Sequence, residues 1–208
     1  MNSKTPTEIN LKTQAELLTK DLRRQIIMDY PEIDLHKQLK RLFQTMQPNY
    51  TVEVTHGSQE FGKDLVIVKS DEFGNEVFGV VVKCGHIRGK TRGDVDSLKD
   101  RIDDVFSKAE DKRLDEIKSQ IQQAFAHPAE MKSYLEDLPV TKVYVVLAGE
   151  LSNNARKRLA NEFTDRIEIY DVIWLIDKFT EFHPHIFFQG RIINFLEKKI
   201  IELEENHH

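Results

Sequence analysis

The chain has little of what would assign it to a specialised class of protein. Cys84 is its only cysteine, so no disulfide can form within the chain, and we expect a cytoplasmic protein. No apolar run approaches the roughly 18 residues that a membrane-spanning helix needs. The first residues also lack the apolar segment of a secretory signal. We therefore expect no membrane among its partners.

Excess positive charge is also missing. The net charge is −5 and the isoelectric point is about 5.9, which excludes a protein covered with basic side chains. One local exception runs from Lys83 to Arg92, where basic residues occur without any acid. Arg88, Lys90 and Arg92 in this run are candidates for contacts with nucleic-acid phosphates. The alternative is a solvated surface loop.

The remaining composition is that of an ordinary globular protein, with 39% hydrophobic and 31% charged residues. Apolar periodicity predicts alternating helices and strands, and hence a three-layer α/β/α sandwich around a mixed central sheet. The expected helices are 9–29, 33–46, a long one from 94 or 96 to 127, one from 152 or 153, 172–182 and 191–204. The expected strands are 50–55, 64–69, 76–84, 143–147 and 167–170.

These elements suggest three parts of the chain. Residues 1–30 are expected to hold an amphipathic helix, residues 31–184 the α/β core, and residues 185–208 a C-terminal helix. The last helix belongs either to the same domain or to a connection or oligomerisation element. Pairing of the terminal helices between copies would make a homo-oligomer.

Two ionisable residues on neighbouring strands suggest chemistry. Asp64 begins one expected strand, and Lys83 ends the strand that follows it through a hairpin. A carboxylate there can hold a divalent cation, while the lysine ammonium orients or polarises an attacking water. The alternatives are a solvated acid at a strand entry and an edge-strand lysine that guards against aggregation.

The ordered series around this pair resembles the PD-(D/E)xK nuclease superfamily, in particular its Mrr-like, restriction-endonuclease-like branch. The similarity covers roughly residues 33 to 182. Its parts are a helix ending near Met46 before the strand 50–55, the element Glu60, Gly62 and Asp64, the run Val81-Val82-Lys83-Cys84-Gly85-His86-Ile87, a long helix with Gln120-Ile121, the strand 142–148 and a helix starting near Ser152.

One position departs from this pattern. The motif carries Glu or Gln two residues before the lysine, whereas this chain has Val81, which cannot bind a metal. Val81 and Lys83 are two apart on one strand, so their side chains share a face. Three interpretations stay open. Glu60 supplies the second carboxylate, an acid on the preceding helix such as Glu32 or Asp34 does so, or the site is degenerate and the domain is a binder.

The resemblance implies a metal-dependent endonuclease that hydrolyses double-stranded DNA. Asp64, Lys83 and Glu60 would be its catalytic residues, and Mg²⁺ or Mn²⁺ would be held by Asp64, Glu60 and the main-chain carbonyl of Val82. Gln120 and Asp34 are possible accessory residues. Relatives of this kind resemble the N-terminal effector domains of bacterial antiphage defence proteins, including STAND NTPases, so a larger defence assembly is a further expectation. The alternative functions are a catalytically inactive module that binds nucleic acid or protein, and an oligomerisation module.

Overall fold

The computed structural model describes residues 13, 15–16, 18–55, 61–72, 74–85, 98–131, 134 and 137–188, with the backbone alone for 98–111. The predicted helix 191–204 and most of the first half of helix 9–29 lie outside these residues. None of the helices within the described ranges carries an apolar stretch of membrane-spanning length.

The centre of the fold is a five-stranded sheet in the order β1-β2-β3-β4-β5. Its strands are β1 (Tyr50–Val54), β2 (Leu65–Asp71), β3 (Gly74–Cys84), β4 (Lys142–Ala148) and β5 (Ile167–Tyr170). The first three pair antiparallel, whereas β3, β4 and β5 run parallel. The sheet is therefore mixed, as the sequence predicts. The end of β3 lies next to the end of β4, with Cys84 opposite Ala148.

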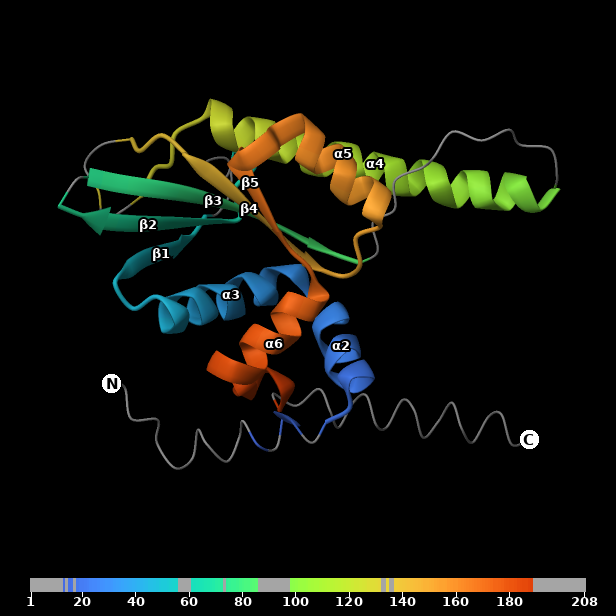
Figure 1. Ribbon diagram of the computed structural model, residues 1–208, viewed down its shortest axis with the longest axis horizontal. Helices are drawn as coiled ribbons and strands as arrows, with labels where there is room; N and C mark the ends of the chain where they lie inside the picture. The colour runs from blue at the N-terminus through green and yellow to red at the C-terminus, as the bar shows by residue number, and fades with distance from the viewer. Residues whose placement is uncertain are drawn as a thin grey trace.

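Three helices cover one face of the sheet (Figure 1). They are α2 (Lys20–Met28), α3 (Glu32–Met46) and α6 (Val172–Phe182). Their apolar stripes pack on every second strand residue, including Leu65, Val80 and Val82. Arg23 of α2 also donates a 2.9 Å hydrogen bond to the Thr180 hydroxyl of α6. The described part of the N-terminal helix thus belongs to this layer.

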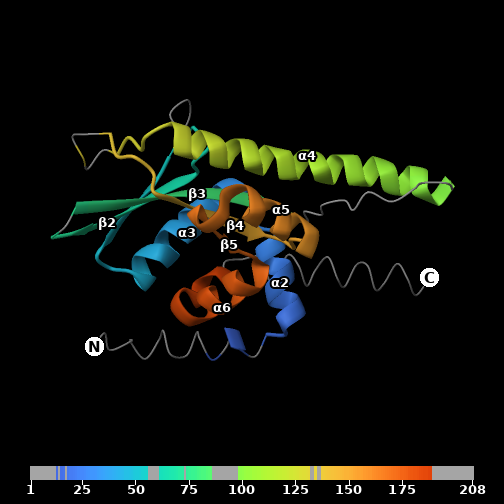
Figure 2. The ribbon, with the colours of Figure 1, turned by 45° about the horizontal axis from the view of Figure 1, so that its top comes forward.

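Two helices cover the opposite face, as Figure 2 also shows. They are α4 (Leu98–Ala126) and α5 (Asn153–Phe163), and a 3₁₀ turn, Thr164–Arg166, leads from α5 into β5. The alternate strand residues, among them Val66, Val81 and Val145, pack beneath these two helices. Both faces of the sheet are covered, which explains why its central strands read as continuous apolar runs. The predicted three-layer α/β/α sandwich is confirmed.

Candidate active site

The segment before β2 is fixed by an unusually close approach to α4. Phe61 and Gly62 both have positive φ angles, 39° and 78°. A Cβ atom on Gly62 would collide with the main-chain carbonyl of Gln120, so only glycine fits between this turn and the helix. The Gly62 of the sequence motif therefore positions the backbone that leads into Asp64.

The next residue, Lys63, is almost completely buried, with 1% of its surface exposed. Its Nζ donates a 3.1 Å hydrogen bond to the carbonyl of His127, immediately after α4. Burial lowers the pKa of Lys63, and the nearby Glu130 partly offsets this effect. The Phe61 ring stacks on the His127 ring with centroids 4.4 Å apart. These contacts hold the whole turn against the end of α4.

Asp64 is buried where β2 begins, with 7% of its surface exposed. Its Oδ2 accepts a 2.6 Å hydrogen bond from the N–H of Val82, and its own N–H donates to the Val80 carbonyl at 2.7 Å. His36 Nε2, on α3, lies 3.9 Å from the other carboxylate oxygen, Oδ1. The carboxylate is thus fixed against β3 and turned toward α3.

Lys83 reaches from β3 to the first turn of α3. Its Nζ lies 3.5 Å from Oε1 of Glu32, and 23% of its side chain is exposed. Glu32 also lies at the helix N-terminus, where the helix dipole favours a negative charge. Asp34, the other acid proposed on this helix, lies 3.4 Å from Lys37 on an exposed side. The structure therefore brings Glu32, rather than Asp34, next to Lys83.

The groups of this site come together around Cys84. Its half-buried Sγ lies 3.7 Å from the Tyr30 carbonyl, just before α3. Burial raises the pKa of the Cys84 thiol to about 11, with smaller contributions from Glu32 and Asp64 that raise it and from Lys83 that lowers it. One thiol therefore senses both carboxylates and the ammonium. Asp64 and Lys83 share this site, but their contacts described above are with other groups.

Val81 and Val82 point to opposite faces of the sheet. Val81 is completely buried with the residues under α4 and α5, and Val82 is buried with the α3 side. Since the Val82 N–H points to Asp64, its carbonyl also faces the β2 side. This orientation suits the predicted metal-binding role of the Val82 carbonyl. Val81 brings no polar atom to the site.

Several predicted site residues cannot be placed. Glu60, Arg88, Lys90 and Arg92 lie outside the described residues. Gln120 is described, and its backbone contacts Gly62 as noted above. Its buried Oε1 has no hydrogen-bond partner among the described residues. In the same ranges, no group of three His, Cys, Asp or Glu side chains is placed to hold a metal ion.

Sequence reasoning missed two residues of this site, His36 and Lys63. The spacing Glu32-x-x-x-His36 places both side chains on one face of α3. That spacing was a usable signal for His36. Lys63 gave none, because a lysine in a glycine turn is normally expected in solvent.

No family model matches the chain, and no curated protein matches it. Among solved structures, the restriction endonuclease FokI, bound to DNA or alone, is similar with a TM-score of 0.40 and 12% identity over 86% of this chain. The restriction endonuclease MspJI in complex with an oligonucleotide is similar with a TM-score of 0.36 and 10% identity over 86% of this chain. The chain spans 31% of the FokI chain and 32% of the MspJI chain.

Proposed function

We propose that the chain is a metal-dependent DNA endonuclease domain. The observation that carries the proposal is the buried Asp64 carboxylate, held by the Val82 N–H beside the Lys83–Glu32 pair. A buried acid with a fixed orientation, close to a lysine and a second acid, is an arrangement expected of a reactive site and costly in a purely structural one.

The oxygen donors of this site fit a hard divalent cation such as Mg²⁺ or Mn²⁺. Asp64 would provide a carboxylate and Val82 its carbonyl, with Glu60 as the proposed further ligand. Water completes the coordination, since Mg²⁺ keeps several water ligands in most protein sites. The bound metal would supply a water of lowered pKa and offset negative charge on the phosphate.

Lys83 supplies the positive charge on the protein side. In the proposed reaction, water attacks phosphorus, a new P–O bond forms, and the bond to one ester oxygen breaks. The proton lost by the water balances the proton taken up by the leaving oxygen. The Lys83 ammonium orients the water and stabilises charge on the phosphate oxygens. Glu32 keeps the flexible Lys83 side chain directed into the site.

The finer parts of the proposal are supported by the resemblance alone. They are the Mrr-like branch, double-stranded DNA as substrate, phosphate contacts from Arg88, Lys90 and Arg92, and a role as an antiphage effector in a larger assembly. Cytoplasmic location and homo-oligomers through the terminal helices have the same standing.

The decisive experiment is plasmid cleavage with Mg²⁺ or Mn²⁺, comparing wild type with Asp64→Asn. Asparagine keeps an oxygen that accepts the Val82 N–H, whereas alanine would leave this N–H without its acceptor, at a cost of about 1–3 kcal/mol. We expect cleavage by the wild type and none by a folded Asp64→Asn. Equal cleavage by both proteins would remove Asp64 from the reaction.

A catalytically inactive binding module is the second candidate. Val81 favours it, because a buried apolar side chain stands where the motif carries a metal-binding acid. This candidate predicts that the wild type binds DNA but leaves it intact with either metal. Cleavage that depends on Asp64 would exclude it.

A further inference from the structure

The glycine after Cys84 is covered by a cationic side chain from α4. Gly85 has a φ of +90°, and a Cβ atom built on it would lie 2.9 Å from Nη1 and 3.9 Å from Cζ of Arg113. The guanidinium of Arg113 therefore lies directly over the bare backbone of Gly85. Since each strand residue advances the chain by about 3.3 Å, this point is close to Lys83, two residues earlier.

The backbone below Gly85 is packed just as tightly. Gly85 donates its N–H to the Ala148 carbonyl at 3.1 Å, and a Cβ atom on Gly149 would collide with the Gly85 carbonyl. The ends of β4 and β3 and the Arg113 side chain thus form three successive layers without intervening side chains. This stacking sets the position of an exposed arginine beside the end of β3.

The charges at this end of the sheet leave a role for Arg113. Lys83 lies against Glu32, so the described side chains of the site, Asp64, Glu32 and Lys83, together carry one negative charge. A DNA phosphate brought to this place adds another. A guanidinium stays charged at every physiological pH and can hold two phosphate oxygens at once through its planar fork.

We propose that Arg113 is a phosphate-binding and positioning residue of the site, which grips the DNA backbone next to the scissile phosphate from the α4 side. The inference rests on the proposed endonuclease function and adds to it a residue that does not belong to the sequence motif. Asp64 and Lys83 would act on the phosphate from the sheet edge, while Arg113 holds the strand in register over Gly85.

A purely structural role for Arg113 makes different predictions. If the side chain only packs on Gly85, its removal lowers stability and leaves the salt dependence of DNA binding unchanged. A phosphate contact instead contributes to the slope of log K against log salt, by about 0.9 per contact. The salt slope is therefore the measurement that separates the two roles.

The experiment measures binding of a labelled DNA duplex by fluorescence anisotropy in EDTA over a range of salt concentrations, together with plasmid cleavage in Mn²⁺. The variants are Arg113→Ala and Arg113→Lys, each checked by thermal unfolding. Lys178→Ala is the matched control, because it removes one positive charge from α6, on the other face of the sheet, where Lys178 pairs with Glu181 at 3.4 Å.

For Arg113→Ala we expect about tenfold weaker binding, a salt slope smaller by about 0.9, and slower cleavage. Arg113→Lys should keep the wild-type slope, because the charge remains, and bind more weakly, because the fork is lost. It also serves as the test protein if Arg113→Ala does not fold. Lys178→Ala should behave as the wild type.

Two failures can be told apart. If the wild type cleaves DNA and Arg113→Ala binds with the wild-type affinity and slope, the inference is wrong and the endonuclease proposal stands. If the wild type neither binds nor cleaves DNA, the proposed function fails and the inference falls with it.

Discussion

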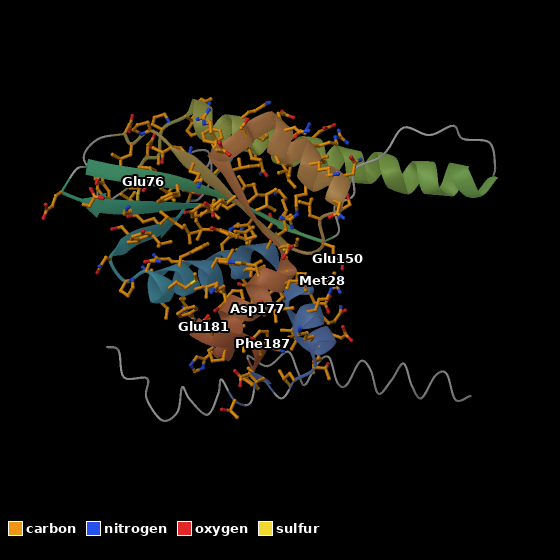
Figure 3. All side chains as sticks on the ribbon, viewed as in Figure 1. Met28, Glu76, Glu150, Asp177, Glu181 and Phe187 are labelled. Carbon is orange, nitrogen blue, oxygen red and sulfur yellow. The ribbon has the colours of Figure 1, made fainter. Side chains whose placement is uncertain are left out.

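The β2–β3 hairpin carries an acid and a lysine at each of its two ends, and the two ends differ. At the turn end, Lys69 and Glu76 are directly opposite each other, with Nζ and Oε2 3.4 Å apart in solvent. At the site end, Asp64 is buried and bonded to a main-chain N–H, while Lys83 contacts Glu32 of α3. Figure 3 labels Glu76 at the turn end and Glu150, which follows β4, at the other end of the sheet. An acid–lysine pair on adjacent strands therefore does not identify a site by itself.

The difference comes from what covers each end. The turn projects beyond the helices, so Lys69 and Glu76 meet in water, where such pairs contribute little. At the site end, α3 and α4 approach the strands from both faces, and their backbones fix the acid. The following predictions test this contrast, from the largest expected effect to the smallest.

Removing the lysine at each end should separate the functional pair from the surface pair. Lys83→Met keeps the length of the side chain and removes its charge, so we expect plasmid cleavage to fall by about 10³-fold. Lys69→Met removes the same charge from the same hairpin and should cleave as the wild type. Equal rates for the two variants would mean that Lys83 is another surface lysine.

Adding an acid to β3 should also depend on the end. Val81→Glu puts a carboxylate at a completely buried position under α4 and α5, and we expect a loss of about 3 kcal/mol in unfolding free energy. Asn75→Glu, in the exposed turn end of the strand, should cost less than about 0.5 kcal/mol. Urea unfolding measures both. A stable Val81→Glu protein would show that this carboxylate reaches the site instead.

Two glycines with positive φ provide a third comparison. At Gly62, with φ of 78°, alanine meets the Gln120 carbonyl, whereas at Gly74, with φ of 132°, it meets nothing within 4 Å. We expect Gly62→Ala to lose about 3 kcal/mol through strain and collision, and Gly74→Ala about half of that through strain alone. Gly62→Ala should also impair cleavage, because it displaces Asp64. Thermal unfolding that ranks Gly74→Ala as the worse variant would contradict this.

The smallest effect is expected from Glu168, an acid of β5 remote from the site end. Hydrogen bonds from Lys142 and Tyr170 lower the pKa of Glu168 below its ordinary value of 4.5. A lowered folded-state pKa contributes stability above pH 4.5 that is lost as the pH falls through the lowered value. Because the pair is well exposed, Glu168→Gln should cost less than about 1 kcal/mol at neutral pH. The difference from the wild type should vanish near about pH 3 in urea unfolding.

Much of the fold could be predicted from local patterns. The alternation of apolar residues gave the helices and strands, and the apolar run 143–147 correctly indicated a central parallel strand. The site was less accessible to this reasoning. Gly62 and Asp64 were singled out as motif residues, but the contacts that require Gly62 come from α4, more than 50 residues later, where Gln120 meets it. His36, Lys63 and Arg113 acquire their roles only through such distant contacts.

The sequence by itself determined the layers of this protein, because periodicity and chain order dictate which residues become helices, strands and buried faces. Only the tertiary structure decided which charges matter. Burial, main-chain hydrogen bonds and the approach of helices depend on segments far apart in the chain, and these separate Asp64 and Lys83 from the equally suggestive Lys69 and Glu76. They also made Glu32 the acid beside Lys83, because it lies in the first turn of α3, facing the end of β3, while Asp34 lies on another side of the same helix.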